Sequence, residues 1–89
     1  MDVGKRFAAN LVRCRKRANL SQEDLALRAG LSRNQISRIE RLKTLPRIDT
    51  VLKLSGALAV PSRELTKGIV WEPPQGSEEG RFEFFAPFR

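Results

Sequence analysis

The sequence predicts an all-α fold, a compact domain of five helices, followed by a short C-terminal β-strand or hairpin. Three observations lead to this prediction: apolar residues recur at helical spacing, helix-capping residues separate the recurring segments, and four of the five phenylalanines lie in the last eight positions. A chain of 89 residues is long enough for one hydrophobic core. We therefore expect a helical domain in residues 1–69 and an aromatic tail in residues 70–89.

The first two helices are predicted from spacing and capping residues. Residues 3–18 place apolar side chains at steps of three or four, which gives one apolar helix face. Ser21 then caps a second helix at residues 22–29, and Asp24, three positions after it, nearly completes a capping box. Gly30 suits a tight exit from this helix because glycine adopts positive φ without steric cost.

Three further helices follow along the chain. Ser32 and Gln35 repeat the capping-box pattern, which predicts a third helix at residues 33–41. A proline ends that helix, and helical spacing resumes at residues 47–59. A short fifth helix is predicted at residues 63–67, anchored by one leucine and ended by a glycine.

Charge is distributed unevenly along the sequence. Residues 1–69 carry 15 basic and 6 acidic side chains, a net charge of +9, whereas residues 70–89 carry 2 basic and 4 acidic side chains, a net charge of −2. A basic helical body is typical of proteins that bind polyanions, with nucleic acid ahead of an anionic membrane, although a solvated surface also fits this composition.

Composition excludes several function classes. One cysteine and no histidine exclude an internal disulfide framework and leave no ligand set for structural zinc. The absence of histidine also removes the commonest general base, so we expect no enzyme, no metal and no cofactor. No apolar run reaches the length of a membrane span and the N-terminus lacks the features of a signal peptide, so we expect a cytoplasmic protein with no membrane partner.

The second and third predicted helices have the pattern of a helix-turn-helix. Two short helices joined by a glycine-bearing turn cross at a large angle and leave the second helix free to enter a DNA major groove. Apolar side chains are expected to hold the pair together: Leu25, Ala26, Leu31, Ile36 and Ile39. The opposite face of the later helix is polar and able to bond base edges: Arg33, Asn34, Ser37 and Arg38.

This pattern resembles the lambda-repressor and Cro-like helix-turn-helix family, also called the XRE family. The resemblance rests on LSQEDLALRAGLSRNQISRIER at residues 20–41 and KTLPRIDTVLKLSGALAVP at residues 43–61, and it covers about residues 3–69. It implies a five-helix, lambda-repressor-like domain that binds double-stranded operator DNA as a twofold dimer.

On matching positions, the resemblance implies base contacts by Arg33, Asn34, Ser37 and Arg38. Phosphate contacts are expected from Gln22 and Lys43 by resemblance, and from Arg15, Lys16 and Arg17 by charge. The resemblance also implies a structural ion pair between Arg15 and Glu40. Leu42 stands where the family often has glycine, and since leucine tolerates positive φ poorly, we expect a longer or differently turned helix end there.

The aromatic tail lies beyond the resemblance, and three alternatives remain for it. It is disordered, or residues 69–71 and 81–85 form a hairpin against their own domain, or its strands pair with a second protomer. We favour the third alternative, because a two-stranded hairpin alone is marginally stable. The residues assigned to dimerisation are Trp71, Phe82, Phe84, Phe85 and Phe88.

The sequence therefore predicts a sequence-specific, double-stranded DNA-binding transcriptional regulator. We expect a repressor that binds a palindromic operator as a homodimer. The alternative is an antitoxin-like protein-interaction module, in which the tail binds a partner protein and the helical body autoregulates. Neither function requires catalysis.

Overall fold

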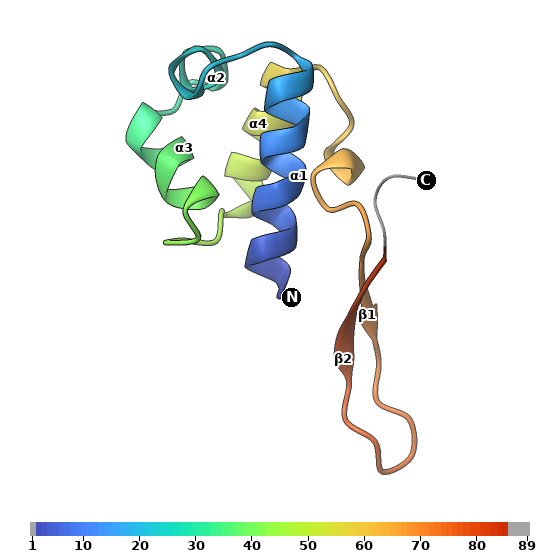
Figure 1. Ribbon diagram of the computed structural model, residues 1–89. Helices are drawn as coiled ribbons and strands as arrows, with labels where there is room; N and C mark the ends of the chain where they lie inside the picture. Colours follow the sequence, from blue (N-terminus) through green and yellow to red (C-terminus); the bar gives the residue numbers. More distant parts are fainter. Residues whose placement is uncertain (1, 86–89) are drawn as a thin grey trace.

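The computed structural model describes residues 2–85, and this part of the chain forms four α-helices followed by a two-stranded hairpin. The elements in order are α1 (Val3–Arg17), α2 (Gln22–Ala29), α3 (Arg33–Glu40), α4 (Ile48–Leu58), a 3₁₀ turn η1 (Ser62–Glu64), β1 (Ile69–Glu72) and β2 (Arg81–Phe84). The helices gather in one bundle, and the hairpin projects from it (Figure 1). The molecule therefore measures 47 × 27 × 19 Å along its principal axes.

The starts of α2 and α3 are fixed by complete capping boxes. The hydroxyl of Ser21 accepts a hydrogen bond from the Asp24 N–H at 3.0 Å, and the Asp24 carboxylate accepts one from the Ser21 N–H at 3.3 Å. The same reciprocal pair joins Ser32 and Gln35, at 3.1 and 2.9 Å. Each box satisfies two backbone N–H groups that a helix start otherwise leaves without a partner. Both helix starts confirm the prediction.

One hydrophobic core joins all four helices and the segment after η1. Its members are Phe7, Leu11, Cys14, Leu20, Leu25, Ala26, Ala29, Ile36, Ile39, Val51, Leu54, Leu58 and Leu65. Leu31 packs against this cluster while staying partly exposed. Full burial of a large aliphatic side chain contributes about 1.5–3 kcal/mol, so this cluster is the main stabilising feature of the bundle.

The fifth helix predicted at residues 63–67 is wrong, because this segment forms only the 3₁₀ turn η1. The N–H groups of Glu64 and Leu65 donate to the carbonyl oxygens of Pro61 and Ser62, three residues back, which is 3₁₀ hydrogen bonding. A five-residue segment closes too few α-helical hydrogen bonds to offset the cost of starting a helix. The fully buried Asn10 side chain holds the backbone after this turn, because its Nδ2 donates to the carbonyl oxygens of Leu65 at 2.9 Å and Lys67 at 3.0 Å. The predicted ends of the other helices agree with the structure to within about one residue, the usual uncertainty of helix ends.

The tail forms an antiparallel hairpin within one chain. The paired residues are Ile69 with Phe84, Val70 with Glu83, Trp71 with Phe82, and Glu72 with Arg81. The two strands therefore pair within one chain, and the strand pairing between protomers that the sequence favoured stays a prediction. Phe88, one of the residues assigned to dimerisation, lies outside the described residues.

Arg6 of α1 anchors the root of the hairpin. Its side chain is buried, and its guanidinium donates hydrogen bonds to the carbonyl oxygens of Gly68 and Phe85. It also lies 5.7 Å from the centre of the Phe84 ring, within the range of a cation–π contact. Gly68 has a φ of 82°, and a Cβ there would collide with Arg6 and with the Phe85 carbonyl. The close approach at the root therefore requires glycine.

Candidate nucleic-acid interface

The α3 helix presents one polar face to solvent and buries the other. Arg33, Asn34 and Arg38 are exposed and Ser37 is half-buried. On the opposite side, Ile36 is 0% and Ile39 is 5% exposed. The structure therefore brings the four residues predicted as base contacts onto one outward face, and the isoleucines fix that face toward solvent.

The turn between α2 and α3 is closed by backbone hydrogen bonds. Gly30 has a φ of 70°, and the Leu31 N–H donates to the Ala26 carbonyl oxygen at 2.9 Å. This six-to-one hydrogen bond after a left-handed glycine is the Schellman motif. Because α3 begins two residues after Leu31, this turn sets the direction in which α3 leaves the bundle.

The C-terminal end of α3 is held by a buried ionic network. Arg15 on α1 donates to both carboxylate oxygens of Glu40, from Nε at 2.7 Å and from Nη2 at 3.0 Å. Gln22 at the start of α2 donates to the same carboxylate at 2.9 Å. The side chains of Arg15 and Glu40 are only 13% and 7% exposed. This network ties α3 to α1 and α2, so the orientation of α3 does not depend on apolar packing alone.

The residues predicted as phosphate contacts separate into two groups. Arg15 and Gln22 are turned toward Glu40, and Arg15 Nη1 also donates to the Leu20 carbonyl oxygen at 2.9 Å. The remaining three, Lys16, Arg17 and Lys43, are exposed. Lys16 and Arg17 lie in the last turn of α1, and Lys43 lies just beyond α3. Arg15 is therefore a structural residue first, whereas the other basic side chains are open to an anionic partner.

The end of α3 has the turn that the family usually makes with glycine, although Leu42 stands in the glycine position. Leu42 adopts a φ of 65°, and the Lys43 N–H donates to the Arg38 carbonyl oxygen at 2.8 Å. The helix therefore ends in a glycine-type turn with leucine in the glycine position, and the expected longer or differently turned end is wrong. A non-glycine residue in this conformation costs about 1–2 kcal/mol, which the rest of the bundle offsets.

A shallow groove of about 220 Å³ runs between α3 and the start of α4. Its lining includes Gln35, Arg38, Thr44, Arg47 and Thr50. The Arg47 side chain is 86% exposed and lies 3.5 Å from Asp49, an exposed pair of little energetic weight. Neither Arg47 nor the exposed Arg41 was predicted as a contact residue; the signal for both was positive charge immediately beyond α3.

Within residues 2–85 no helix is long and apolar enough to cross a membrane. Nor do any three cysteine, aspartate or glutamate side chains of the described residues gather as a metal site.

Two short helices across a tight glycine turn, the second with a polar outward face, define a helix-turn-helix DNA-binding domain. The family described as Helix-turn-helix (HTH_3) matches residues 11–65, and the chain belongs to this family. The chain is 35% identical over 65 residues to an uncharacterized HTH-type transcriptional regulator, y4dJ, of Sinorhizobium fredii, a match that covers 73% of this chain and 84% of that protein.

Solved structures agree with this assignment. The restriction-modification controller protein C.AhdI of Aeromonas hydrophila is 35% identical with a TM-score of 0.68, covering 70% of this chain and 94% of its own. The DNA-binding domain of the P22 C2 repressor is 31% identical with a TM-score of 0.68, covering 76% of this chain and 88% of its own. The protein is thus a DNA-binding regulator of the helix-turn-helix family.

Proposed function

We propose that the protein is a transcriptional repressor that binds a palindromic operator as a homodimer, with α3 in the major groove. The observation that carries this proposal is the outward polar face of α3, which buried isoleucines and the Glu40 network hold in one orientation. Two proteins of similar structure are named a restriction-modification controller and a repressor, which supports a regulatory role.

The residues of α3 have the chemistry needed to distinguish bases. Arg33 is suited to a bidentate contact with guanine, and Asn34 to one with adenine, each worth about 1–3 kcal/mol of discrimination. Ser37 and Arg38 lie one turn further along the same face and extend the contact along the groove. Arg33 and Asn34 occupy the first turn of α3, the part of a recognition helix that contacts base edges.

Exposed basic residues at the end of α1 and in the segment after α3 supply the phosphate contacts. We assign this role to Lys16, Arg17 and Lys43, and add Arg41 and Arg47 from the structure. Gln22 contributes indirectly, by bracing Glu40 at the end of α3. Arg15 is left out of the proposed contacts, because three of its nitrogen atoms already donate to Glu40 and Leu20.

A homodimer follows from the length of the reading element. The eight residues of α3 span only a few base pairs. Two copies on half-sites about 34 Å apart double the contacted sequence and reach the selectivity that an operator needs. Occupancy of such a site next to a promoter blocks the polymerase without any catalytic step.

Selection of bound sequences from random double-stranded DNA tests the proposal. We expect an inverted repeat whose half-sites lie one helical turn or a multiple of it apart. The variant Lys43→Ala should weaken binding to all sequences and lower the salt slope by about 0.9. The matched control Lys67→Ala, an exposed lysine between η1 and β1 and outside the helix-turn-helix, should leave the slope unchanged. Failure to enrich any sequence would contradict the proposed function.

A further inference from the structure

The hairpin has one entirely apolar face. We call residues 69–84, the two strands with their connecting turn, the arm. Its strand register and the alternation of side chains place Ile69, Trp71, Phe82 and Phe84 on one face. The other face carries Val70, Glu72, Arg81 and Glu83. On the apolar face the Trp71 and Phe82 rings meet edge to face, with their centres 5.0 Å apart.

The outer half of this apolar face is not covered by its own chain. Ile69 and Phe84, near the root, are half-buried, whereas Trp71 is 50% and Phe82 is 48% exposed. A two-stranded hairpin needs packing on one face to be stable, and neighbouring exposed aromatic side chains mark an interaction surface. Within one chain, the apolar face of the arm is therefore only partly packed.

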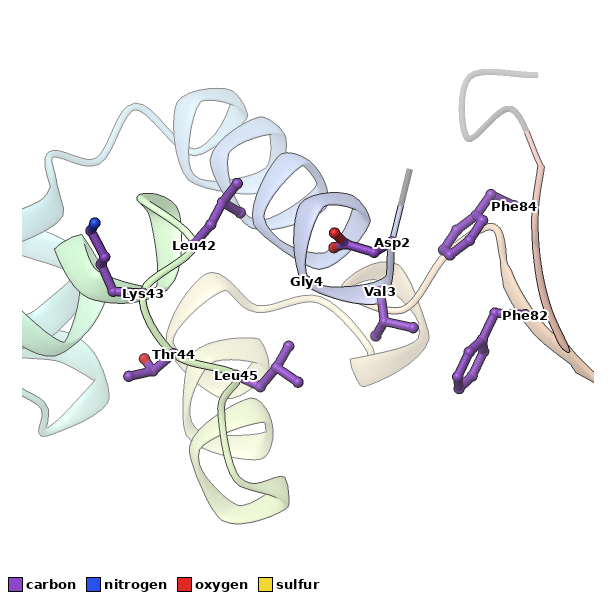
Figure 2. A pocket seen from close by; sticks show the side chains of 9 residues that line it. All are labelled: Asp2, Val3, Gly4, Leu42, Lys43, Thr44, Leu45, Phe82 and Phe84. Carbon is purple, nitrogen blue, oxygen red and sulfur yellow. The ribbon is translucent and has the colours of Figure 1, made fainter.

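An open groove of about 610 Å³ lies beside this face, between the arm and the helical bundle (Figure 2). Phe82 and Phe84 form one wall, and Leu45, in the loop after α3, lies across from them. The remaining lining comes from the start of α1 and the same loop: Asp2, Val3, Gly4, Leu42, Lys43 and Thr44. Leu42 and Leu45 are 49% and 65% exposed, so this groove, which we call the arm groove, has apolar surface on both sides.

We propose that a second copy of this chain fills the arm groove, with each arm inserting Trp71 and Phe82 into the groove of the other copy. A twofold axis makes this contact twice, because each copy carries both the inserting face and the receiving groove. The contact joins faces of the two arms, with no strand pairing between protomers. It completes the packing of the arm and buries the exposed leucines of the loop after α3.

Charge favours a second copy as the occupant. The arm carries four carboxylates and one guanidinium, a net charge of −3, whereas residues 2–68 carry 15 basic and 6 acidic side chains, a net charge of +9. The arm projects away from its own bundle (Figure 1). A second bundle of the same chain therefore offers this acidic arm a basic surface, and complementary charge of this kind favours association.

The contact between arm and arm groove also affects the proposed DNA site. The loop that follows α3 lines the arm groove, and Lys43 lies in it between Leu42 and Leu45. An arm from the second copy packed there fixes this loop and the separation of the two α3 helices. The inference therefore rests on the proposed function, which includes a homodimer, and adds to it the surface through which the two copies meet.

The two faces of the arm provide a matched test by sedimentation of the full chain. We expect wild type to dimerise and Phe82→Glu to raise the dimer dissociation constant at least about thirtyfold, the effect of removing a central interface anchor. Val70→Glu, on the opposite face, and Leu27→Glu, on α2 with the side chain 83% exposed, should leave the constant within about threefold of wild type. Unchanged circular dichroism of the helices checks that each variant folds.

The single tryptophan gives an independent readout, because Trp71 lies in the proposed contact. Its fluorescence should shift to shorter wavelength as the wild-type concentration rises through the dissociation constant, and Phe82→Glu should abolish the shift. The proposal is overturned if wild type stays monomeric, if Phe82→Glu dimerises like wild type, or if Val70→Glu disrupts the dimer equally. None of these outcomes involves DNA. A dimer that fails to bind DNA would contradict only the proposed function, and a DNA-binding dimer that Phe82→Glu leaves intact would contradict only the arm contact.

Discussion

Removal of the Glu40 carboxylate tests how the recognition helix is held. In the wild type the Arg15 side chain is only 13% exposed; in Glu40→Ala it loses both of its carboxylate contacts, and Gln22 loses its acceptor. Stranding one partner of a buried ion pair typically costs about 3–5 kcal/mol. In a domain of 89 residues each kcal/mol lowers the melting temperature by about 4–8 °C. We therefore expect Glu40→Ala to melt roughly 12–40 °C below wild type.

Two comparison variants separate this cause from a general loss of charge. Asp49→Ala removes a carboxylate from an exposed pair, with side chains 86% and 54% exposed, so its free energy of unfolding should change by less than about 1 kcal/mol. The double variant Arg15→Met with Glu40→Leu removes both buried charges and should recover most of the loss, because an apolar pair of similar volume needs no partner. Thermal melts by circular dichroism measure all three. Equal melting temperatures for Glu40→Ala and wild type would refute this account of α3.

Three further predictions concern the backbone and the arm root. In the Phe82→Glu background, where the arm contact is absent, Leu42→Gly should raise the free energy of unfolding by about 0.5–1 kcal/mol, because glycine relieves the φ of 65° and the leucine side chain is half exposed. A lower melting temperature would contradict this. Asn10→Ala should lower the free energy of unfolding by about 1–3 kcal/mol, because two backbone carbonyls lose their donor. Denaturant titration measures this change, and an unchanged midpoint would show that the contact does not stabilise the fold. Arg6→Ala should speed hydrogen exchange of the Phe85 amide at least about tenfold while amides in α2 keep their rates; equal protection would remove Arg6 as the anchor of the arm.

The local features of the fold could be predicted from sequence, because they depend on neighbouring residues. Ser21 and Ser32 signal helix starts through partners three positions away, and Gly30 signals a helix end by itself. The outward face of α3 follows from the spacing of Ile36 and Ile39. Such signals need no knowledge of distant parts of the chain.

The errors arise where distant residues decide the local structure. The backbone after η1 is held by Asn10, which lies 55 positions before Leu65 and donates to its carbonyl oxygen. The anchoring of the arm depends on Arg6 and Phe85, which are 79 positions apart. The prediction for the end of α3 is wrong because Leu42 adopts a positive φ that leucine alone disfavours, and the surrounding structure holds it there. Neither Asn10 nor Arg6 carries a local pattern that distinguishes it from an ordinary helix residue.

The measurement that most directly tests the central claim is the ratio of affinities for the selected operator and for random DNA, in wild type and in Arg33→Ala. Loss of one bidentate base contact, worth about 1–3 kcal/mol, should reduce this ratio roughly five- to 150-fold. Binding to random DNA should change far less. The matched control Arg63→Ala, an exposed arginine on η1 distant from α3, should keep the wild-type ratio (Figure 1). A wild-type ratio in both Arg33→Ala and Asn34→Ala would contradict the claim that the outward face of α3 reads the DNA sequence.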